Sequence, residues 1–261
     1  QFRGLAYRDA RTLRFEGADS TIEGQDASLR LIGRGRWQFD ALAYVQARNF
    51  TNVVISSSSF TPVLDQRNTP SIGLGGKFEL RPPTGEDNVL RLGVDYRRSD
   101  GELFETAISA FSGAVTARRN AGGTNSDLGL FIENDWTLGA LTLTGGARLD
   151  RWSIRDGFFS ERDANGLPVA AETFADRAGW DASFRGGLLL RPSNTLALRA
   201  AAYSGLRLPT LNELYRPFVV FPVVTQANAG LRNERLEGFE AGLDVAPTET
   251  LSLSLTAFDN R

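Results

Sequence analysis

The sequence predicts an all-β protein, specifically part of an antiparallel transmembrane β-barrel. Apolar and polar residues alternate in almost every segment, which places the two classes on opposite faces of a sheet. Leu141, Leu143 and Leu149 share one face, for example, and Thr142 and Thr144 share the other. Short and long connectors also alternate along the chain. That order is typical of a barrel with short periplasmic turns and long extracellular loops.

The alternating pattern defines about eleven strands, each with ends uncertain by a few residues. A barrel strand needs only about ten residues to cross the apolar layer of a membrane, and most of these segments are close to that length. They lie at residues 2–15, 26–33, 36–50, 70–80, 88–99, 127–138, 140–152, 180–191, 195–206, 236–246 and 251–261.

Turn-forming residues separate these strands at the short connections. The short turns are at 34–35, 81–85, 139–140, 192–194 and 247–249. The longer connectors hold polar residues, glycine and aromatic residues, and they lie at 16–25, 51–69, 100–126, 153–179 and 207–235. Because the two kinds alternate, all of the long connectors are expected at one end of the barrel.

Composition narrows the function. The chain has no apolar run near the ~20 residues that a spanning helix needs. It contains 0 cysteines and 0 histidines, so thiol chemistry and the commonest general base and metal ligand are missing. No catalytic residue, metal site or cofactor is therefore predicted, and the protein is not expected to be an enzyme. With 29 basic and 31 acidic residues, the sequence shows no electrostatic footprint for nucleic acid.

A soluble β-sandwich or propeller is the main alternative fold, because half-buried strands alternate there too. Tryptophan placement favours the barrel. Trp37 and Trp136 adjoin short turns, and Trp152 and Trp180 flank a long connector. All four are predicted at strand ends, where a barrel places its aromatic belts at the two membrane interfaces.

Three short motifs follow one another near the end of the chain. The first is R-x-P-T-x-x-E-L, carried by Arg207, Pro209, Thr210, Glu213 and Leu214. A loop motif and the pattern G-x-E-x-G follow, carried by Asn228, Leu231 and Glu234 and then by Gly238, Glu240 and Gly242. In order and spacing these motifs resemble the barrel of TonB-dependent outer-membrane receptors. The loop motif departs at Ala229 and Asn233, where that family usually has proline.

The resemblance implies a barrel of ~22 strands with a plug in its lumen and a TonB-type partner that acts on a segment before the plug. Residues 1–261 are then expected to be part of one barrel domain, about half of its strands, with the signal peptide, plug and C-terminal strands outside. It implies energised uptake of a scarce nutrient, such as a ferric siderophore, cobalamin or an oligosaccharide, across a Gram-negative outer membrane. Lipid, lipopolysaccharide and a small-molecule ligand are the other implied partners.

Two further function classes stay open at this point. The protein could be a passive porin-like channel or structural barrel, and the two readings differ in whether a plug precedes the first strand. A barrel enzyme is the third class and the weakest, because the hydrolase barrels that it would resemble rely on histidine.

The connector 207–235 is expected at the extracellular mouth, where it would contribute to ligand capture. Its candidate ligand-binding residues are Arg207, Asn212, Tyr215, Arg216 and Phe218. A structural role is expected for the motif residues Pro209, Thr210, Glu213, Asn228, Leu231 and Glu234. The alternative for the aromatic cluster, which includes Phe221 and Pro222, is a loop packed on its own aromatic side chains. The Arg118–Arg119 pair is predicted in a solvated loop, with contact to an anionic ligand or lipopolysaccharide as its alternative role.

Overall fold

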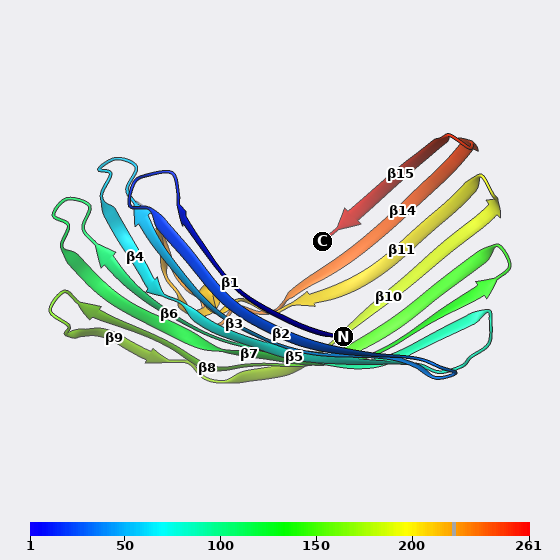
Figure 1. Cartoon of the computed structure of the whole chain (residues 1–261), viewed down its shortest axis with the longest axis horizontal. Coiled ribbons are helices and arrows are strands. Elements are labelled where there is room, and N and C mark those ends of the chain that lie inside the picture. Colours follow the sequence, from blue (N-terminus) through cyan, green and yellow to red (C-terminus); the bar gives the residue numbers. More distant parts are fainter. Residues whose placement is uncertain (221–222) are drawn as a thin grey trace.

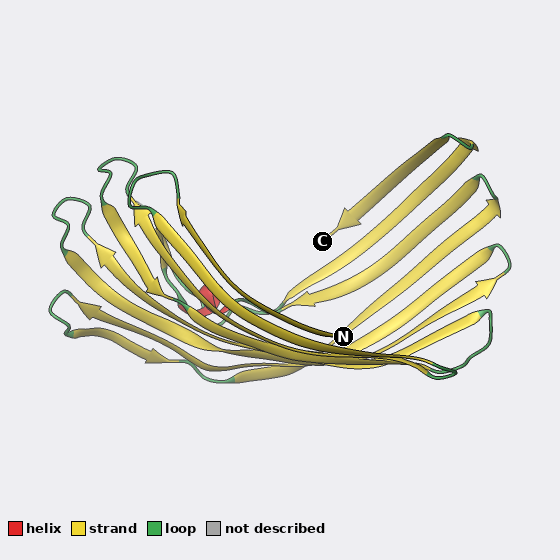
Figure 2. Ribbon diagram, in the orientation of Figure 1, coloured by secondary structure: helices red, strands yellow, loops and turns green. Residues whose placement is uncertain are grey.

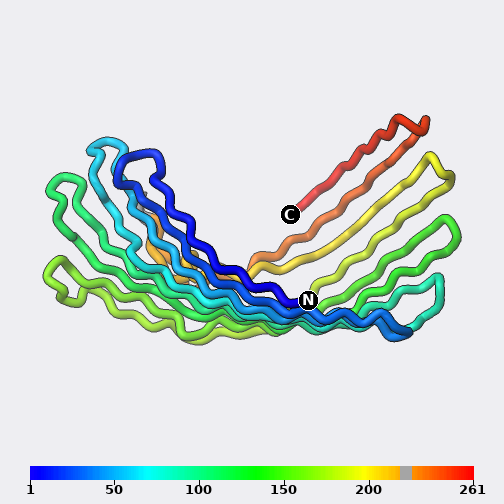
Figure 3. The backbone as a smooth tube through the Cα atoms, viewed as in Figure 1, coloured from blue at the N-terminus to red at the C-terminus, as the bar shows by residue number. Residues whose placement is uncertain are grey.

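The computed structural model of the chain describes residues 1–220 and 223–261, with the side chains of 218–224 left aside. The chain forms one large antiparallel sheet that curves into a trough (Figure 1). The backbone trace shows that the trough is open, with β1 at one edge and β15 at the other (Figure 3). The described residues include no helix with the length and hydropathy that crossing a membrane requires.

The elements follow in chain order. They are β1 (Phe2–Thr12), β2 (Asp19–Arg34), β3 (Gln38–Ile55), β4 (Pro62–Asn68), β5 (Pro70–Arg81), β6 (Asn88–Ile108), β7 (Val115–Leu138), β8 (Leu141–Asp163), β9 (Pro168–Thr173), β10 (Arg177–Ser193), β11 (Leu196–Arg207), α1 (Leu211–Tyr215), β12 (Phe218–Val220), β13 (Val223–Thr225), β14 (Glu234–Thr248) and β15 (Leu251–Asn260).

Strand order in the sheet follows the sequence. The sheet has 13 strands, but β4 and β5 both lie between β3 and β6, and β9 precedes β10 beside β8. β4 and β5 together make one crossing between the two ends of the sheet, and so do β9 and β10. The chain therefore makes eleven crossings from one end of the sheet to the other. Every predicted strand corresponds to one crossing. The prediction of an antiparallel partial barrel is confirmed.

The predicted long connectors were wrong in extent. β6 runs on to Ile108 and β7 begins at Val115, so only residues 109–114 connect them instead of 100–126. Beyond the apolar zone both faces of a strand meet water, so the alternation lapses although the backbone pairing continues. Arg118 and Arg119 therefore lie in β7 and not in a loop, and Arg119 pairs with Glu161 at 2.6 Å.

The two faces of the sheet differ in chemistry. α1 lies inside the curve (Figure 2), so the face that it contacts is the concave one. On the convex face apolar residues pair with apolar residues across the strands: Leu190 pairs with Leu198, and Leu198 with Leu243. Leu198 stays 38% exposed and Leu253 56% exposed. A single layer with half-exposed leucines excludes the sandwich for these strands, because its core would bury them.

Ion pairs cover the concave face, as the alternation predicts. Arg148 donates to Asp150 at 2.7 Å and to Asp95 at 3.0 Å. Nearer the short turns, Arg91 donates to Glu133 and to Asp135, each at 2.7 Å. Carboxylates and guanidinium groups thus alternate along the inner surface.

Tryptophan placement follows the prediction in part. Trp136 and Trp180 lie on the convex face and are 43% and 59% exposed. Trp152 was predicted at a strand end facing a membrane interface, and this was wrong. β8 continues eleven residues beyond it, and its indole points to the concave side, where Nε1 donates to Asp181 at 2.9 Å.

Candidate functional site

The segment between β11 and β14 turns inward and rests on the concave face near the long-loop end. It contains α1 and the short hairpin of β12 and β13. The helix begins where Thr210 caps it: Glu213 N donates to Thr210 Oγ1 at 3.3 Å, and Thr210 N donates to Glu213 Oε2 at 2.7 Å. This reciprocal capping box satisfies backbone donors that a five-residue helix otherwise leaves open.

An ion-pair clamp closes the base of this segment. Arg207, the last residue of β11, donates to Glu213 at 3.0 Å and to Glu234, the first residue of β14, at 2.7 Å. The bonds from Arg207 and from the Thr210 backbone lower the pKa of Glu213 to about 2. The clamp therefore joins the two strands and the helix while all three side chains are charged.

Glycines on the strands make room for the helix. A Cβ on Gly157 would lie 2.3 Å from the Tyr215 ring, and one on Gly123 would lie 3.0 Å from it. Leu211 fills the neighbouring position, 3.3 Å from where a Cβ on Gly101 would be. Phe174 stacks on Tyr215 with ring centroids 5.0 Å apart. Tyr215 is 2% exposed, and this burial raises the pKa of its phenol.

A buried carboxylate fixes the far end of the helix. Glu105 is 1% exposed and accepts from Arg216 at 2.9 and 3.1 Å. Arg119 reaches the same carboxylate at 3.4 Å. Gln66 lies beside Arg216, and with its amide oxygen turned toward the guanidinium it accepts at 2.7 Å. Arg216 thus neutralises a charge that would otherwise be costly to bury.

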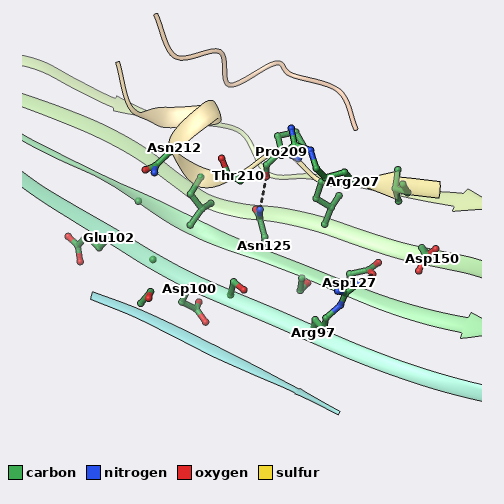
Figure 4. Close-up of a pocket in the computed structure, with 18 of the residues that line it drawn as sticks. Arg97, Asp100, Glu102, Asn125, Asp127, Asp150, Arg207, Pro209, Thr210 and Asn212 are labelled. Atoms are coloured by element: carbon green, nitrogen blue, oxygen red, sulfur yellow. Dashed lines mark hydrogen bonds and ion pairs between the residues drawn. The ribbon is translucent and has the colours of Figure 1, made fainter. Parts of the chain in front are cut away.

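A hollow of about 750 Å³ lies between this segment and the strands β6, β7 and β8. Figure 4 shows Arg207, Pro209 and Asn212 on one side and the strands on the other. Asn125 crosses the gap, donating to the Pro209 carbonyl at 2.9 Å. On the floor, Oδ1 of Asp127 is buried without a hydrogen-bond partner.

The hollow has the chemistry of a binding site for a polar molecule. Its lining combines hydroxyl, amide, carboxylate and guanidinium groups. Within the described residues, no group of three or more acidic side chains is placed to hold a metal ion. The geometry can therefore hold a small molecule by hydrogen bonds and charge.

The structure separates the predicted ligand-binding residues. Arg207 and Asn212 border the hollow. Tyr215 and Arg216 do not: Tyr215 packs against the glycines under the segment, and Arg216 pairs with Glu105. Phe218 belongs to β12, but its side chain lies outside those described, as do Phe221 and Pro222. Direct ligand contact by these residues stays a prediction.

The motif residues lie in the same segment. Pro209 is buried, and its carbonyl accepts from Asn125. Asn228 N donates to the Glu213 carbonyl at 3.1 Å, and the Leu231 carbonyl accepts from Arg177 at 2.9 Å. These contacts connect the returning half of the segment to α1 and to β10.

Sequence reasoning missed Glu105, Asn125 and Asp127. All three bear on the segment or on the floor of the hollow, and they fall at the end of or beyond the predicted strands 88–99 and 127–138. The only sequence signal for these residues would be an apolar/polar alternation that continues past the apolar zone. There both faces of the strands carry polar residues, so no alternation is visible.

A family description, "TonB dependent receptor-like, beta-barrel", matches residues 2–261. The chain therefore belongs to the family of TonB-dependent receptor β-barrels. Comparison with curated protein sequences finds no match.

Solved structures share this fold. The copper transporter OprC has a TM-score of 0.71 at 17% identity, over 94% of this chain and 39% of that one. The ferric yersiniabactin uptake receptor FyuA of Yersinia pestis has a TM-score of 0.67 at 14% identity, over 93% and 36%. The FrpB iron transporter of Neisseria meningitidis has 0.64 at 17% identity, over 99% and 41%. The chain thus spans less than half the length of these proteins, which are described as transporters and an uptake receptor.

Proposed function

We propose that the intact protein is an outer-membrane receptor of a Gram-negative bacterium that takes up a scarce nutrient with energy supplied by a TonB-type protein. Family membership supports this, together with the apolar convex face, which suits contact with lipid. The similar structures are described as a ferric yersiniabactin uptake receptor, a copper transporter and an iron transporter. A ferric siderophore or another metal complex is the corresponding ligand class, with cobalamin and oligosaccharides as further candidates.

The inward segment 208–233 carries the proposal. A receptor needs a preformed polar site, and this segment forms one wall of such a site. Here the clamp, the close contact of α1 with Gly123 and Gly157, and the Glu105–Arg216 pair fix the segment at three places. Asn212 and Arg207 are proposed as contacts to the ligand from the segment, and Asp127 from the floor. Tyr215 and Arg216 would act by positioning the segment.

Whole-cell binding and uptake test this function. The full-length receptor is expressed in cells without their own receptors, and candidate labelled ferric siderophores are offered with and without a functional TonB system. Energised uptake that disappears without TonB is expected. Uptake that continues without it would instead indicate the porin-like alternative.

Two variants test the hollow as part of the site. Asn212→Ala removes a hydrogen-bonding amide, and Asp127→Asn removes the negative charge and replaces one acceptor oxygen by a donor. Each change should weaken ligand binding about 2- to 10-fold. Asn165→Ala, at an exposed turn away from the hollow, is the matched control and should bind as wild type. Unchanged binding by both test variants, at equal amounts of folded receptor, would remove this hollow from the site.

A further inference from the structure

Three arginines gather on the convex face, where its apolar rows end toward the long loops. We name Arg98 of β6 and Arg151 and Arg155 of β8 the convex arginine cluster. Both strands pair with β7, so about two strand spacings, roughly 10 Å, separate them. Long arginine side chains can converge on one anion across that distance.

The pairing places these arginines on the outer face. Ile154 is buried beneath α1 on the concave side, and successive side chains of a strand point to opposite faces. Its neighbours Ser153 and Arg155 therefore face outward, and so does Arg151. Arg98 pairs with Ser126, whose hydroxyl meets that of Ser153 at 2.8 Å on the same face.

The height of the cluster follows from the tryptophans. Trp136, near the short turns, lies in one row with Leu143 and Leu188. Trp180 precedes Leu188 by eight residues in the same strand, which is about 26 Å along the strand and roughly 20 Å of height at the usual tilt. This is close to the ~25 Å apolar band of outer-membrane barrels.

Arg151 consequently lies at the upper edge of the band. It pairs in register with Trp180, and its guanidinium lies over that indole at 5.7 Å. Tyr96 lies in the same row across β7. Tryptophan and tyrosine are the residues that prefer the headgroup level of a membrane. Arg98 and Arg155 lie beyond this row, farther from the apolar band.

The cluster has more positive than negative charge. Asp100 binds Arg98 at 2.7 and 2.9 Å, and Asp156 is near enough to Arg98 to interact electrostatically. Arg151 donates to the carbonyls of Trp152 and Gly179, at 3.2 and 3.1 Å. Among the residues that the structure describes, no carboxylate forms a salt bridge with Arg151 or with Arg155.

We propose that the convex arginine cluster binds the phosphate group of an anionic lipid in the outer leaflet. The planar guanidinium forms paired, charge-assisted hydrogen bonds with phosphate oxygens. The paired hydroxyls of Ser126 and Ser153 between the arginines leave one further donor, and Trp180 and Tyr96 contact the adjoining acyl and headgroup region. This inference rests on the membrane placement proposed above for the convex face.

Lipid binding to the purified, folded full-length receptor in neutral detergent tests the proposal. The probes are lipid A with its phosphates and lipid A from which they have been removed, measured as bound lipid by native mass spectrometry. Arg151→Gln with Arg155→Gln is the test variant. Arg34→Gln with Arg36→Gln makes the same charge change at the opposite end of the strands and is the matched control.

Phosphorylated lipid A should bind more tightly than the dephosphorylated form. The affinity of the test variant for phosphorylated lipid A should fall about fivefold per arginine, roughly 25-fold in all, because each basic residue near an anionic surface has an effect of that order. The control variant should bind as wild type. Equal binding of the two lipids, or equal losses in the two variants, would overturn the proposal, and so would full displacement of the lipid by millimolar inorganic phosphate. If cell fractionation instead finds the receptor outside the outer membrane, the proposed function fails as well.

Discussion

Gly157→Ala tests whether the docking of the inward segment requires the close contact between Gly157 and the Tyr215 ring. The added Cβ would lie 2.3 Å from the Tyr215 ring, where ordinary contacts begin at about 3.4 Å. The ring cannot move aside freely, because Phe174 stacks on it and Leu214 beside it is 0% exposed. α1 must therefore lift from β8 by about an ångström.

Overpacking of this kind costs about 1–3 kcal/mol. The strain is confined to the contact between α1 and the sheet, so it should shift the docking of the segment and leave the strands paired. A cost of that size corresponds to a roughly 5- to 150-fold larger undocked population.

Hydrogen exchange reports that population. The amides of Leu214 and Arg216 donate within α1, to Thr210 and Asn212, and they should exchange faster by the same factor in the full-length receptor. Gly186→Ala is the control, because its Cβ would meet only Thr144 O at 4.0 Å. Equal protection of α1 in the two variants would refute the idea that close packing on Gly157 holds the segment.

Three further predictions concern charge and face. Leu143→Arg, on the convex face, should destabilise the intact barrel by about 2–4 kcal/mol, whereas Thr144→Arg on the concave face should cost much less; equal losses in urea unfolding would contradict the face assignment. Glu105→Gln leaves Arg216 and Arg119 without their shared charge, so α1 should become more accessible to protease while the amount of folded barrel is unchanged; unaltered cleavage would exclude this anchor. Because the folded pKa of Glu213 is depressed to about 2, the clamp should be intact above about pH 4.5 and be lost as pH falls toward 2. Pepsin cleavage of the segment should rise over that interval in wild type and show a smaller step in Glu213→Gln, where only Glu234 still pairs with Arg207.

The strands could be predicted where a strand has one apolar and one polar face. Leu141, Leu143 and Leu149 alternate with polar residues because the convex face is apolar and the concave face carries charged side chains. Above the apolar zone this contrast is lost, so β6 and β7 continue there without an apolar/polar alternation in their sequence. That is why Asn125 and Glu105 were missed although the strands that carry them were found.

The arrangement of the inward segment could be predicted only locally. Thr210 and Glu213 are three residues apart, and their spacing alone indicates a capping box. The pair of Arg216 and Glu105 joins residues 111 positions apart, and no periodicity connects them. The position of Tyr215 could not be predicted either, because an aromatic ring in this loop suits a ligand surface as well as a packing contact. The structure decides between the two, since the ring packs on Gly157 and Gly123.

The sheet topology sets a condition on the rest of the barrel. The eleven crossings from β1 to β15 form ten neighbouring pairs, and each pair is antiparallel, so β1 and β15 run in the same direction. These two edges cannot close on each other in an antiparallel barrel. A closed antiparallel barrel that contains this sheet would need an odd number of further strands between them, which gives the even total found in single-chain bacterial barrels. Without those strands both edges expose unpaired backbone groups, which lipid cannot satisfy.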